Sequence, residues 1–381
     1  MSDTPNNNSS ETRFDRFIDR LFSMVVMQPT TLCPWTCTYC YLTTKNQKLE
    51  MSPGIAHAVA HSIQAQGSDT AVDLLWHGGE PLSIGPQKLE LLLACFEELR
   101  REGRVRHSVQ TNAGLITSQW CDLLSTYGFS VGVSIDGPEW ANTQRRDKAG
   151  RSTHARTMRG LQTLQAHGIP FSVIAVITTE TIGRADEIID FFESLGAQRV
   201  GFNLEEQEGA NAGRPVIDRA AATLFWRTVF QRRAAGSPLV VREVEHALTY
   251  LRHARKNGLP GVALHDPIPT VAWNGDTVIL SPELAGIREP AYDDFVLGNV
   301  LVDSLPDMLR RAHGMRYVDE FTQALESCAG SCEFYGFCGG SQAGNRYFEH
   351  GSFVDSETAF CVNTRQALIS GLYELSTSSE E

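Results

Sequence analysis

Apolar stretches alternate with amphipathic stretches over the first two thirds of the chain. Residues 173–177, Val-Ile-Ala-Val-Ile, have the continuous apolar character of a strand buried on both faces. The stretches between have helical spacing: Ser52 precedes the first as a capping residue, and Gly128, Gly168 and Gly196 follow others as helix-ending glycines. The predicted strands cover 23–28, 72–76, 107–111, 130–135, 171–177 and 199–203. The predicted helices cover 53–66, 87–102, 118–127, 154–167, 182–195 and 217–234.

Six strand–helix units in series predict an α/β fold with a parallel sheet and right-handed crossovers. Six strands are too few to close an eight-stranded barrel, so we expect an open, partial barrel. A doubly wound open sheet is the alternative that periodicity leaves open.

After about residue 236 the regular alternation of predicted strands and helices ends. A helix is predicted over 240–256, and Asn274-Gly275 between alternating apolar residues predicts a β-hairpin. We expect a barrel over 14–236, a linker helix over 237–261, and a second module over 262–375. That module would hold the hairpin, two helices, a cysteine-rich loop and a closing helix over 364–375. The polar ends, 1–13 and 376–381, are expected to be disordered tails.

Composition narrows the class of protein. The chain has 381 residues, 42% of them hydrophobic, and a net charge of −12, which argues against a nucleic-acid binder because such proteins carry a basic surface. No apolar run approaches the roughly 20 residues of a membrane span, and no signal peptide is evident, so a cytoplasmic protein is expected. In that compartment nine cysteines are more typical of metal binding or catalysis than of disulfides.

Three cysteines lie in one loop directly after the first predicted strand. Cys33, Cys37 and Cys40 have C-x3-C-x2-C spacing, which places three thiolates at the density needed to hold a cubane iron–sulfur cluster. A [4Fe–4S] cluster needs four ligands, so three leave one iron open for a small molecule. The alternatives are a structural zinc loop and unrelated buried thiols.

Polar residues follow the other predicted strands, where ligands of parallel α/β proteins gather. His77-Gly78-Gly79-Glu80 follows the second strand; its glycines allow close backbone approach, and its carboxylate suits an ammonium group. The remaining strand ends carry Asn112, Ser134, Asp136 and Asn203.

A second group of cysteines lies near the C-terminus. Cys328, Cys332, Cys338 and Cys361 supply four thiolates, enough for another cubane or for a structural zinc ion. Spacing alone does not separate these two metals.

Taken together, the first loop and the Gly78-Gly79-Glu80-Pro81 turn resemble the radical S-adenosylmethionine (radical SAM) enzymes. The resemblance implies a partial (β/α)6 barrel, a SAM-binding [4Fe–4S] cluster on Cys33, Cys37 and Cys40, and an oxidoreductase that works through a 5′-deoxyadenosyl radical. The SAM contacts it implies are Tyr39, Gly78, Gly79, Glu80, Asn112, Ser134, Asp136, Arg145 and Asn203.

Residues 326–365 are similar to the SPASM/twitch modules that follow radical SAM cores in peptide-modifying enzymes. The two-cluster SPASM type has a cysteine five positions after the hairpin glycine, where this chain has Leu280. The resemblance therefore implies one auxiliary [4Fe–4S] cluster without an open iron, suited to electron transfer. Its implied ligands are Cys328, Cys332, Cys338 and Cys361.

Most of 23–365 is similar to the cyclophane-forming radical SAM/SPASM peptide maturases, as in Asn274-Gly275-Asp276 and Phe337-Cys338-Gly339-Gly340. This implies a ribosomal precursor peptide as substrate, an electron donor such as flavodoxin or ferredoxin, and a bond between an aromatic ring carbon and the Cβ of a nearby residue. The alternatives are an ether or thioether crosslink, sulfatase-type maturation, and a zinc-stabilised binding module without catalysis.

Overall fold

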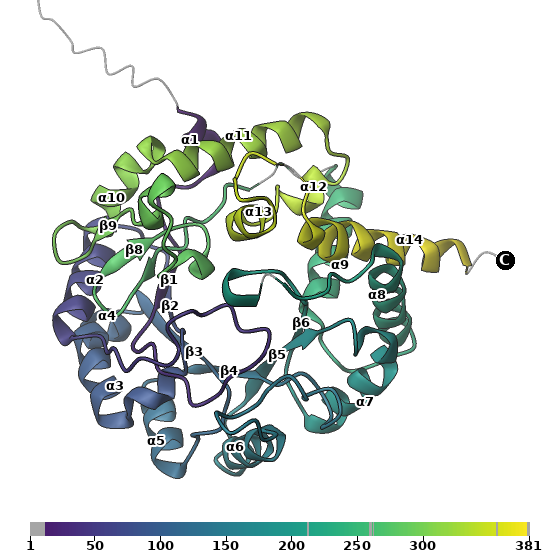
Figure 1. The fold of residues 1–381 in the computed structure, drawn as a ribbon, viewed down its shortest axis with the longest axis horizontal. Coiled ribbons are helices and arrows are strands. Elements are labelled where there is room, and N and C mark those ends of the chain that lie inside the picture. Colours follow the sequence, from purple (N-terminus) through teal and green to yellow (C-terminus); the bar gives the residue numbers. More distant parts are fainter. Residues whose placement is uncertain (1–11, 212, 259–260, 262, 356, 379–381) are drawn as a thin grey trace, which may run out of the picture.

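A computed structural model describes residues 12–211, 213–258, 261, 263–355 and 357–378. Six parallel strands form one curved sheet inside a ring of helices (Figure 1). They are β1 (Met24–Met27), β2 (Val72–Trp76), β3 (Val105–Thr111), β4 (Ser130–Ser134), β5 (Phe171–Ile177) and β6 (Val200–Leu204). Their spatial order, β6-β5-β4-β3-β2-β1, follows the sequence. A doubly wound sheet reverses direction partway, so the partial barrel is confirmed.

Helices cover the outer face of this sheet, as the five successive right-handed crossovers between its six parallel strands require. The barrel helices are α2 (Pro53–Gln66), α3 (Pro86–Leu93), α4 (Glu97–Arg101), α5 (Ser118–Thr126), α6 (His154–Ala166), α7 (Ala185–Leu195) and α8 (Arg219–Ala234). Short 3-10 turns complete this part: η1 (Pro81–Ile84), η2 (Ala94–Phe96), η3 (Ile182–Arg184) and η4 (Gly209–Asn211).

Two predicted helices are interrupted. The single helix predicted over 87–102 is wrong, because η2 separates α3 from α4. Phe96 leaves helical geometry (φ −108°, ψ 0°) and buries its ring against Trp76 at a centroid distance of 6.2 Å. The helix predicted over 182–195 likewise begins as η3. In the helix predicted over 87–102, packing of Phe96 in the core interrupts a helix that the amphipathic pattern predicts to be continuous.

The residues predicted to begin or end helices lie at helix boundaries in the structure. Gly128, Gly168 and Gly196 all have positive φ at helix ends, as predicted. Ser52 occupies the N-cap position of α2, as predicted, although its side chain makes no capping hydrogen bond.

The hairpin of the second module extends the barrel sheet. Its strands are β7 (Thr270–Val271), β8 (Asp276–Val278) and β9 (Gly298–Asn299). β7 pairs in parallel with β1, β8 pairs antiparallel with β7, and β9 pairs with β8. Strands β7, β8 and β9 are thus built onto the β1 edge of the barrel.

The remaining helices lie across the open side of the barrel (Figure 1). They are α9 (Arg242–Asn257), α10 (Leu305–Arg311), α11 (Arg316–Ser331), α12 (Tyr335–Cys338), α13 (Ala343–His350) and α14 (Ala367–Ser378). Shorter turns are η5 (Pro282–Leu284), η6 (Pro290–Phe295), η7 (Ala312–Gly314) and the π-helical η8 (Cys361–Gln366). α14 lies so close to α8 that a Cβ on Gly371 would come within 2.8 Å of the Arg227 amide nitrogen.

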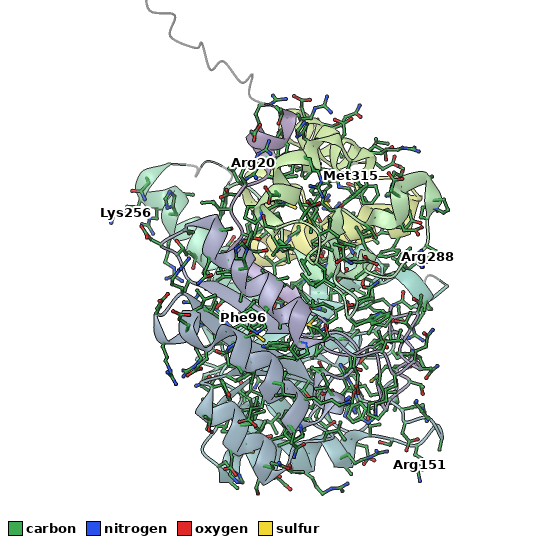
Figure 2. The ribbon with its side chains drawn as sticks, turned by 90° about the vertical axis from the view of Figure 1, so that its left-hand side faces the viewer. Arg20, Phe96, Arg151, Lys256, Arg288 and Met315 are labelled. Carbon is green, nitrogen blue, oxygen red and sulfur yellow. The ribbon has the colours of Figure 1, made fainter. Side chains whose placement is uncertain are left out.

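Parts of both predicted tails belong to helices. Helix α1 (Arg13–Phe17) begins after Thr12 and lies on α11, where Arg13 forms a 3.0 Å ion pair with Asp319. Figure 2 shows that Arg20, shortly after α1, lies toward the same end of the molecule as Met315, whereas Arg151 lies toward the other end. Residues 376–378 belong to α14, and 1–11 and 379–381 lie outside the described residues. Within the described part of the chain, no helix is long and apolar enough to cross a membrane.

Candidate active site

The three-cysteine loop leaves the carboxyl end of β1 and is held by backbone hydrogen bonds on both sides. The Cys33 amide donates to the Lys45 carbonyl at 2.9 Å, and the Thr36 amide donates to the Arg146 carbonyl at 2.7 Å. The loop has little regular structure of its own. Its shape is therefore set by the segments that flank it.

A cavity of about 660 Å³ lies over the carboxyl ends of the strands. Its wall includes all three thiols of the loop. It also includes seven of the nine predicted SAM contacts, namely Tyr39, Gly79, Glu80, Asn112, Ser134, Arg145 and Asn203. Gly78 and Asp136 do not line the cavity, and both are buried.

The two glycines after β2 are required by close packing. Both have positive φ, 92° at Gly78 and 59° at Gly79. A Cβ on Gly79 would lie 2.7 Å from the Thr31 carbonyl oxygen, and one on Gly78 would lie 2.8 Å from Cγ of Gln28. Side chains here would push the turn away from the backbone that leads into the cysteine loop.

Glu80 is a buried carboxyl group without a charged partner among the described residues. It accepts hydrogen bonds from Thr111 Oγ1 at 2.6 Å, the Asn112 amide at 2.8 Å and the Leu82 amide at 3.1 Å. Burial nevertheless raises its pKa to about 7. An ammonium group in the cavity would supply the missing positive charge.

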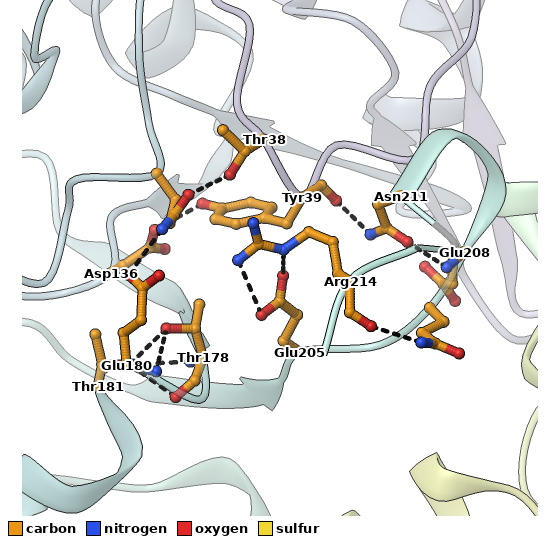
Figure 3. A network of polar contacts seen from close by, with 12 residues as sticks. Thr38, Tyr39, Asp136, Thr178, Glu180, Thr181, Glu205, Glu208, Asn211 and Arg214 are labelled. Carbon is orange, nitrogen blue, oxygen red and sulfur yellow. Dashed lines mark hydrogen bonds and ion pairs between the residues drawn. The ribbon is translucent and has the colours of Figure 1, made fainter. Parts of the chain in front are cut away.

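Asp136 organises two cavity residues although it does not line the cavity. It is 1% exposed and accepts a 2.7 Å hydrogen bond from Tyr39 Oη (Figure 3). It also forms a 3.0 Å ion pair with Arg145, whose guanidinium lies 5.4 Å from the Tyr39 ring centroid. The buried Nε of Arg145 has no partner in the described structure. Asp136 is thus a positioning residue.

Two other polar residues that line the cavity form hydrogen bonds with residues predicted to contact SAM. Gln110 Nε2 donates to Ser134 Oγ at 2.7 Å, and Arg242 Nη2 donates to Asn203 Oδ1 at 2.7 Å. Neither donor is among the SAM contacts that the family resemblance implies. Gln110 precedes a strand end, which was an available signal, whereas Arg242 comes from the predicted linker helix.

The loop after β6 folds back onto the cysteine loop, which the sequence did not indicate (Figure 3). Asn211 Nδ2 donates to the Tyr39 carbonyl at 2.7 Å, and Arg214 forms an ion pair with Glu205. Glu206 and Glu208, from the same loop, line the cavity. Three glutamates directly after a strand end were the available signal.

The second cysteine group comes from three separate elements. Cys328 lies in α11, Cys332 is its C-cap, Cys338 ends α12, and Cys361 begins η8. All four line a cavity of about 370 Å³. No three His, Cys, Asp or Glu side chains of the described residues form a group that could hold a single metal ion.

Polar groups surround these four thiols. Arg346 Nη2 lies 3.5 Å from Cys328 Sγ, and Gln366 Nε2 lies 3.5 Å from Cys361 Sγ. A hydrogen bond from Cys361, with the nearby Arg365 charge, lowers the pKa of Cys338 to about 7. Arg365 also lines the larger cavity, so η8 borders both sites.

Comparisons with known proteins agree with this architecture. Residues 27–192 match the model of the radical SAM superfamily. An uncharacterized protein of Synechocystis, sll1766, is 34% identical over 355 residues, which cover 89% of this chain and 88% of that protein. The serine-type anaerobic sulfatase-maturating enzyme of Klebsiella aerogenes is 32% identical over 193 residues, 49% of this chain and 47% of that enzyme.

Solved structures share the fold. A structure of anSMEcpe with bound AdoMet and Cp18Cys peptide matches with a TM-score of 0.72 at 17% identity, over 94% of this chain and 98% of that one. Streptococcus suis SuiB bound to precursor peptide SuiA matches with a TM-score of 0.57 at 17% identity, over 77% and 65%. The cysteine loop, the strand-end cavity and these matches together show that the chain belongs to the radical SAM superfamily of enzymes.

Proposed function

We propose that the chain modifies a ribosomal precursor peptide by joining an aromatic ring carbon to the Cβ of a nearby residue, forming a cyclophane. One observation carries the proposal: a single cavity is lined both by the three-cysteine loop and by Phe360, Thr364 and Arg365 of the segment around Cys361. A substrate in this cavity would lie between the two cysteine groups. Two structural neighbours, anSMEcpe and SuiB, were determined with bound peptides.

The residues present fit a cluster with SAM. Burial raises the pKa of Cys33 to about 12 and that of Cys37 to about 11. A cationic centre bound to these sulfurs would stabilise the thiolates and lower both pKa values. When bound, the cluster and SAM together supply one-electron cleavage of the sulfonium and abstraction of a hydrogen atom from carbon.

Cavity residues of the chain would hold the methionyl and adenosyl parts of SAM. Glu80 accepts the ammonium group, and Arg145, with its unpaired Nε, supports the carboxylate. Ser134 and Asn203 present polar atoms to the ribose. Asp136 keeps Arg145 and Tyr39 in place, and the loop after β6 limits water access to Tyr39.

The second thiol group fits a further cluster. Cys328, Cys332, Cys338 and Cys361 surround a cavity rather than a single point, and four thiolates complete the ligands of a cubane. Such a cluster supplies one-electron transfer when bound. An external donor such as flavodoxin or ferredoxin would provide the reducing electron for SAM cleavage.

The crosslink removes two hydrogens from the peptide. One Cβ–H bond and one ring C–H bond break, and one carbon–carbon bond forms. The first hydrogen leaves as an atom and ends in 5′-deoxyadenosine. The second leaves as a proton, released to solvent, and an electron, which a cluster held by the four later cysteines would accept. The chain must hold the ring and the Cβ in contact during this sequence, which is the role we assign to the cavity between the two cysteine groups.

The test is to express the protein with the short peptides encoded beside its gene and to analyse those peptides by fragmentation mass spectrometry. A product lighter by two hydrogens, with no fragmentation between the joined residues, is expected. Peptides that stay unmodified with an enzyme that cleaves SAM would overturn the peptide-crosslinking proposal.

Sulfatase-type maturation is the second candidate, favoured by the 32% identity to the Klebsiella enzyme. Oxidation of serine to formylglycine also removes two hydrogens, so mass alone does not separate the two products. A hydrazine probe does, because it labels the aldehyde of formylglycine and leaves a cyclophane unlabelled.

A further inference from the structure

Three glutamates form an acidic wall in the large cavity. Glu206 and Glu208 come from the loop after β6, and Glu283 comes from η5 of the second module. Asn345 Nδ2 donates to both Glu206 and Glu208, and Ser281 Oγ donates to Glu283 at 2.6 Å. Barrel and second module thus contribute carboxyl groups to one surface, which we call the acidic wall.

Two other carboxylates around this cavity, unlike Glu80, are neutralised by arginine. Glu205 pairs with Arg214, and Glu243 pairs with Arg242. No ion pair of the described residues includes a member of the acidic wall. Burial raises the pKa of Glu206 to about 7 and raises those of Glu208 and Glu283 as well. The wall therefore carries three partly buried carboxyl groups without a cationic partner among the described residues, and either bound protons or a cationic ligand must compensate their charge.

Two unpaired polar atoms lie beside the wall. Asn345 is 1% exposed, yet its Oδ1 has no hydrogen-bond partner in the described structure. The hydroxyl of Tyr41, a residue that lines the same cavity, is also buried without a partner. The site thus offers an excess of acceptors, and its complement is a group that only donates. Ammonium and guanidinium are the cationic side-chain groups of that kind, and they also match the charge of ionised carboxylates.

We infer that the acidic wall binds a lysine or arginine side chain of the substrate peptide beside the reacting residues. This rests on the proposed function and names a feature of its substrate. The ammonium of SAM is a different ligand, because Glu80 serves it from β2 and the wall is built by the β6 loop and η5. A cation held on both the barrel and the second module would fix the register of the peptide in the cavity.

The test compares labelled peptides that differ at one position. The probes are fluorescein–Gly-Phe-Xaa-Ser-Gly-amide with Xaa as lysine, arginine, norleucine or glutamate, and binding to the reconstituted full-length protein with SAM is followed by fluorescence anisotropy. We expect the lysine and arginine probes to bind at least about tenfold tighter than norleucine. The variant E206Q/E208Q, and separately E283Q, should reduce that ratio toward one. E326Q, which changes an exposed glutamate of α11 paired with Arg16, is the matched control and should keep the ratio.

Equal affinity across the panel, no binding of any cationic probe, or a preference that survives E206Q/E208Q would overturn the inference. Circular dichroism melting confirms that each variant is folded. The proposed function is judged separately in the same preparation, by 5′-deoxyadenosine formation and by the modified precursor peptide. A crosslinking enzyme without cation preference would therefore remove only the inference.

Discussion

The two cysteine groups of this chain are built in opposite ways. Cys33, Cys37 and Cys40 lie on one loop that opens onto a cavity of about 660 Å³. The four later cysteines come from α11, α12 and η8 and surround a space of about 370 Å³. The first group has three thiols and room for a ligand, and the second has four thiols and a smaller space. The difference supports the proposal that substrate chemistry takes place at the first site and electron transfer at the second.

The two sites also depend on their surroundings differently. The first loop takes its shape from neighbours, chiefly the Gly78–Gly79 turn and the 144–147 segment. The second site is fixed by helix ends, so each thiol is positioned by an element with its own hydrogen bonds. Mutations around the first site should therefore disturb SAM chemistry, and those at the second should disturb product formation alone.

The largest expected effect is at the first site. Cys37→Ala should abolish 5′-deoxyadenosine formation and lower iron from about eight to about four atoms per chain, because three thiolates are needed for the SAM-binding cluster. Iron analysis and chromatographic measurement of 5′-deoxyadenosine check this. Cys95→Ala, at a partly exposed thiol on η2, is the control and should keep both values. Normal SAM cleavage by Cys37→Ala would contradict the assignment.

The matching change at the second site is Cys338→Ala. It should also lower iron to about four atoms per chain, but SAM cleavage should continue while the crosslinked peptide disappears. The ratio of product to 5′-deoxyadenosine measures this uncoupling. Loss of SAM cleavage together with product would show that the two sites are not divided as proposed.

The Gly78–Gly79 turn tests how far the first loop depends on its neighbours. Gly79→Ala places a Cβ 2.7 Å from the Thr31 carbonyl oxygen at a positive φ, and should lower the free energy of unfolding by about 2 to 4 kcal/mol. Gly183→Ala is the control, since a Cβ there meets nothing within 4 Å. Denaturant melts of both variants give the comparison. Equal stability would remove the packing argument.

The change at Glu80 is expected to have the smallest effect, and it concerns the pH dependence of SAM affinity. Burial raises its pKa to about 7, and SAM ammonium binds the ionised form. SAM affinity should therefore rise about tenfold between pH 6 and pH 8, as the carboxyl group loses its proton. Glu80→Gln should bind SAM more weakly with no such rise. Equilibrium dialysis with labelled SAM across this range is the measurement, and an unchanged pH profile in Glu80→Gln would contradict the role.

Much of the fold was predictable because its signals are local. The strands at 72–76 and 171–177 agree residue for residue with β2 and β5. Apolar runs and helix-ending glycines indicate the conformation of the segments in which they lie. The break at Phe96 was not predictable, since it depends on packing against Trp76 from another element. The extension of the barrel sheet by β7 depends equally on long-range pairing.

The residues of the candidate site also differ in how far they could be predicted from the sequence. Motif residues such as Glu80 and Arg145 line the predicted cavity, because the carboxyl ends of parallel strands must meet there. Asp136 was expected to contact SAM, and the structure places it against Tyr39 and Arg145. The acidic wall joins residues 206, 208 and 283, whose proximity follows only from how the second module sits on the barrel.

The division of labour between the two cysteine groups is tested most directly by counting iron in the anaerobically reconstituted wild-type protein. Two cubane clusters require about eight iron atoms per chain, with no zinc. About four iron atoms, or four iron atoms with one zinc, would contradict the electron-transfer role of Cys328, Cys332, Cys338 and Cys361.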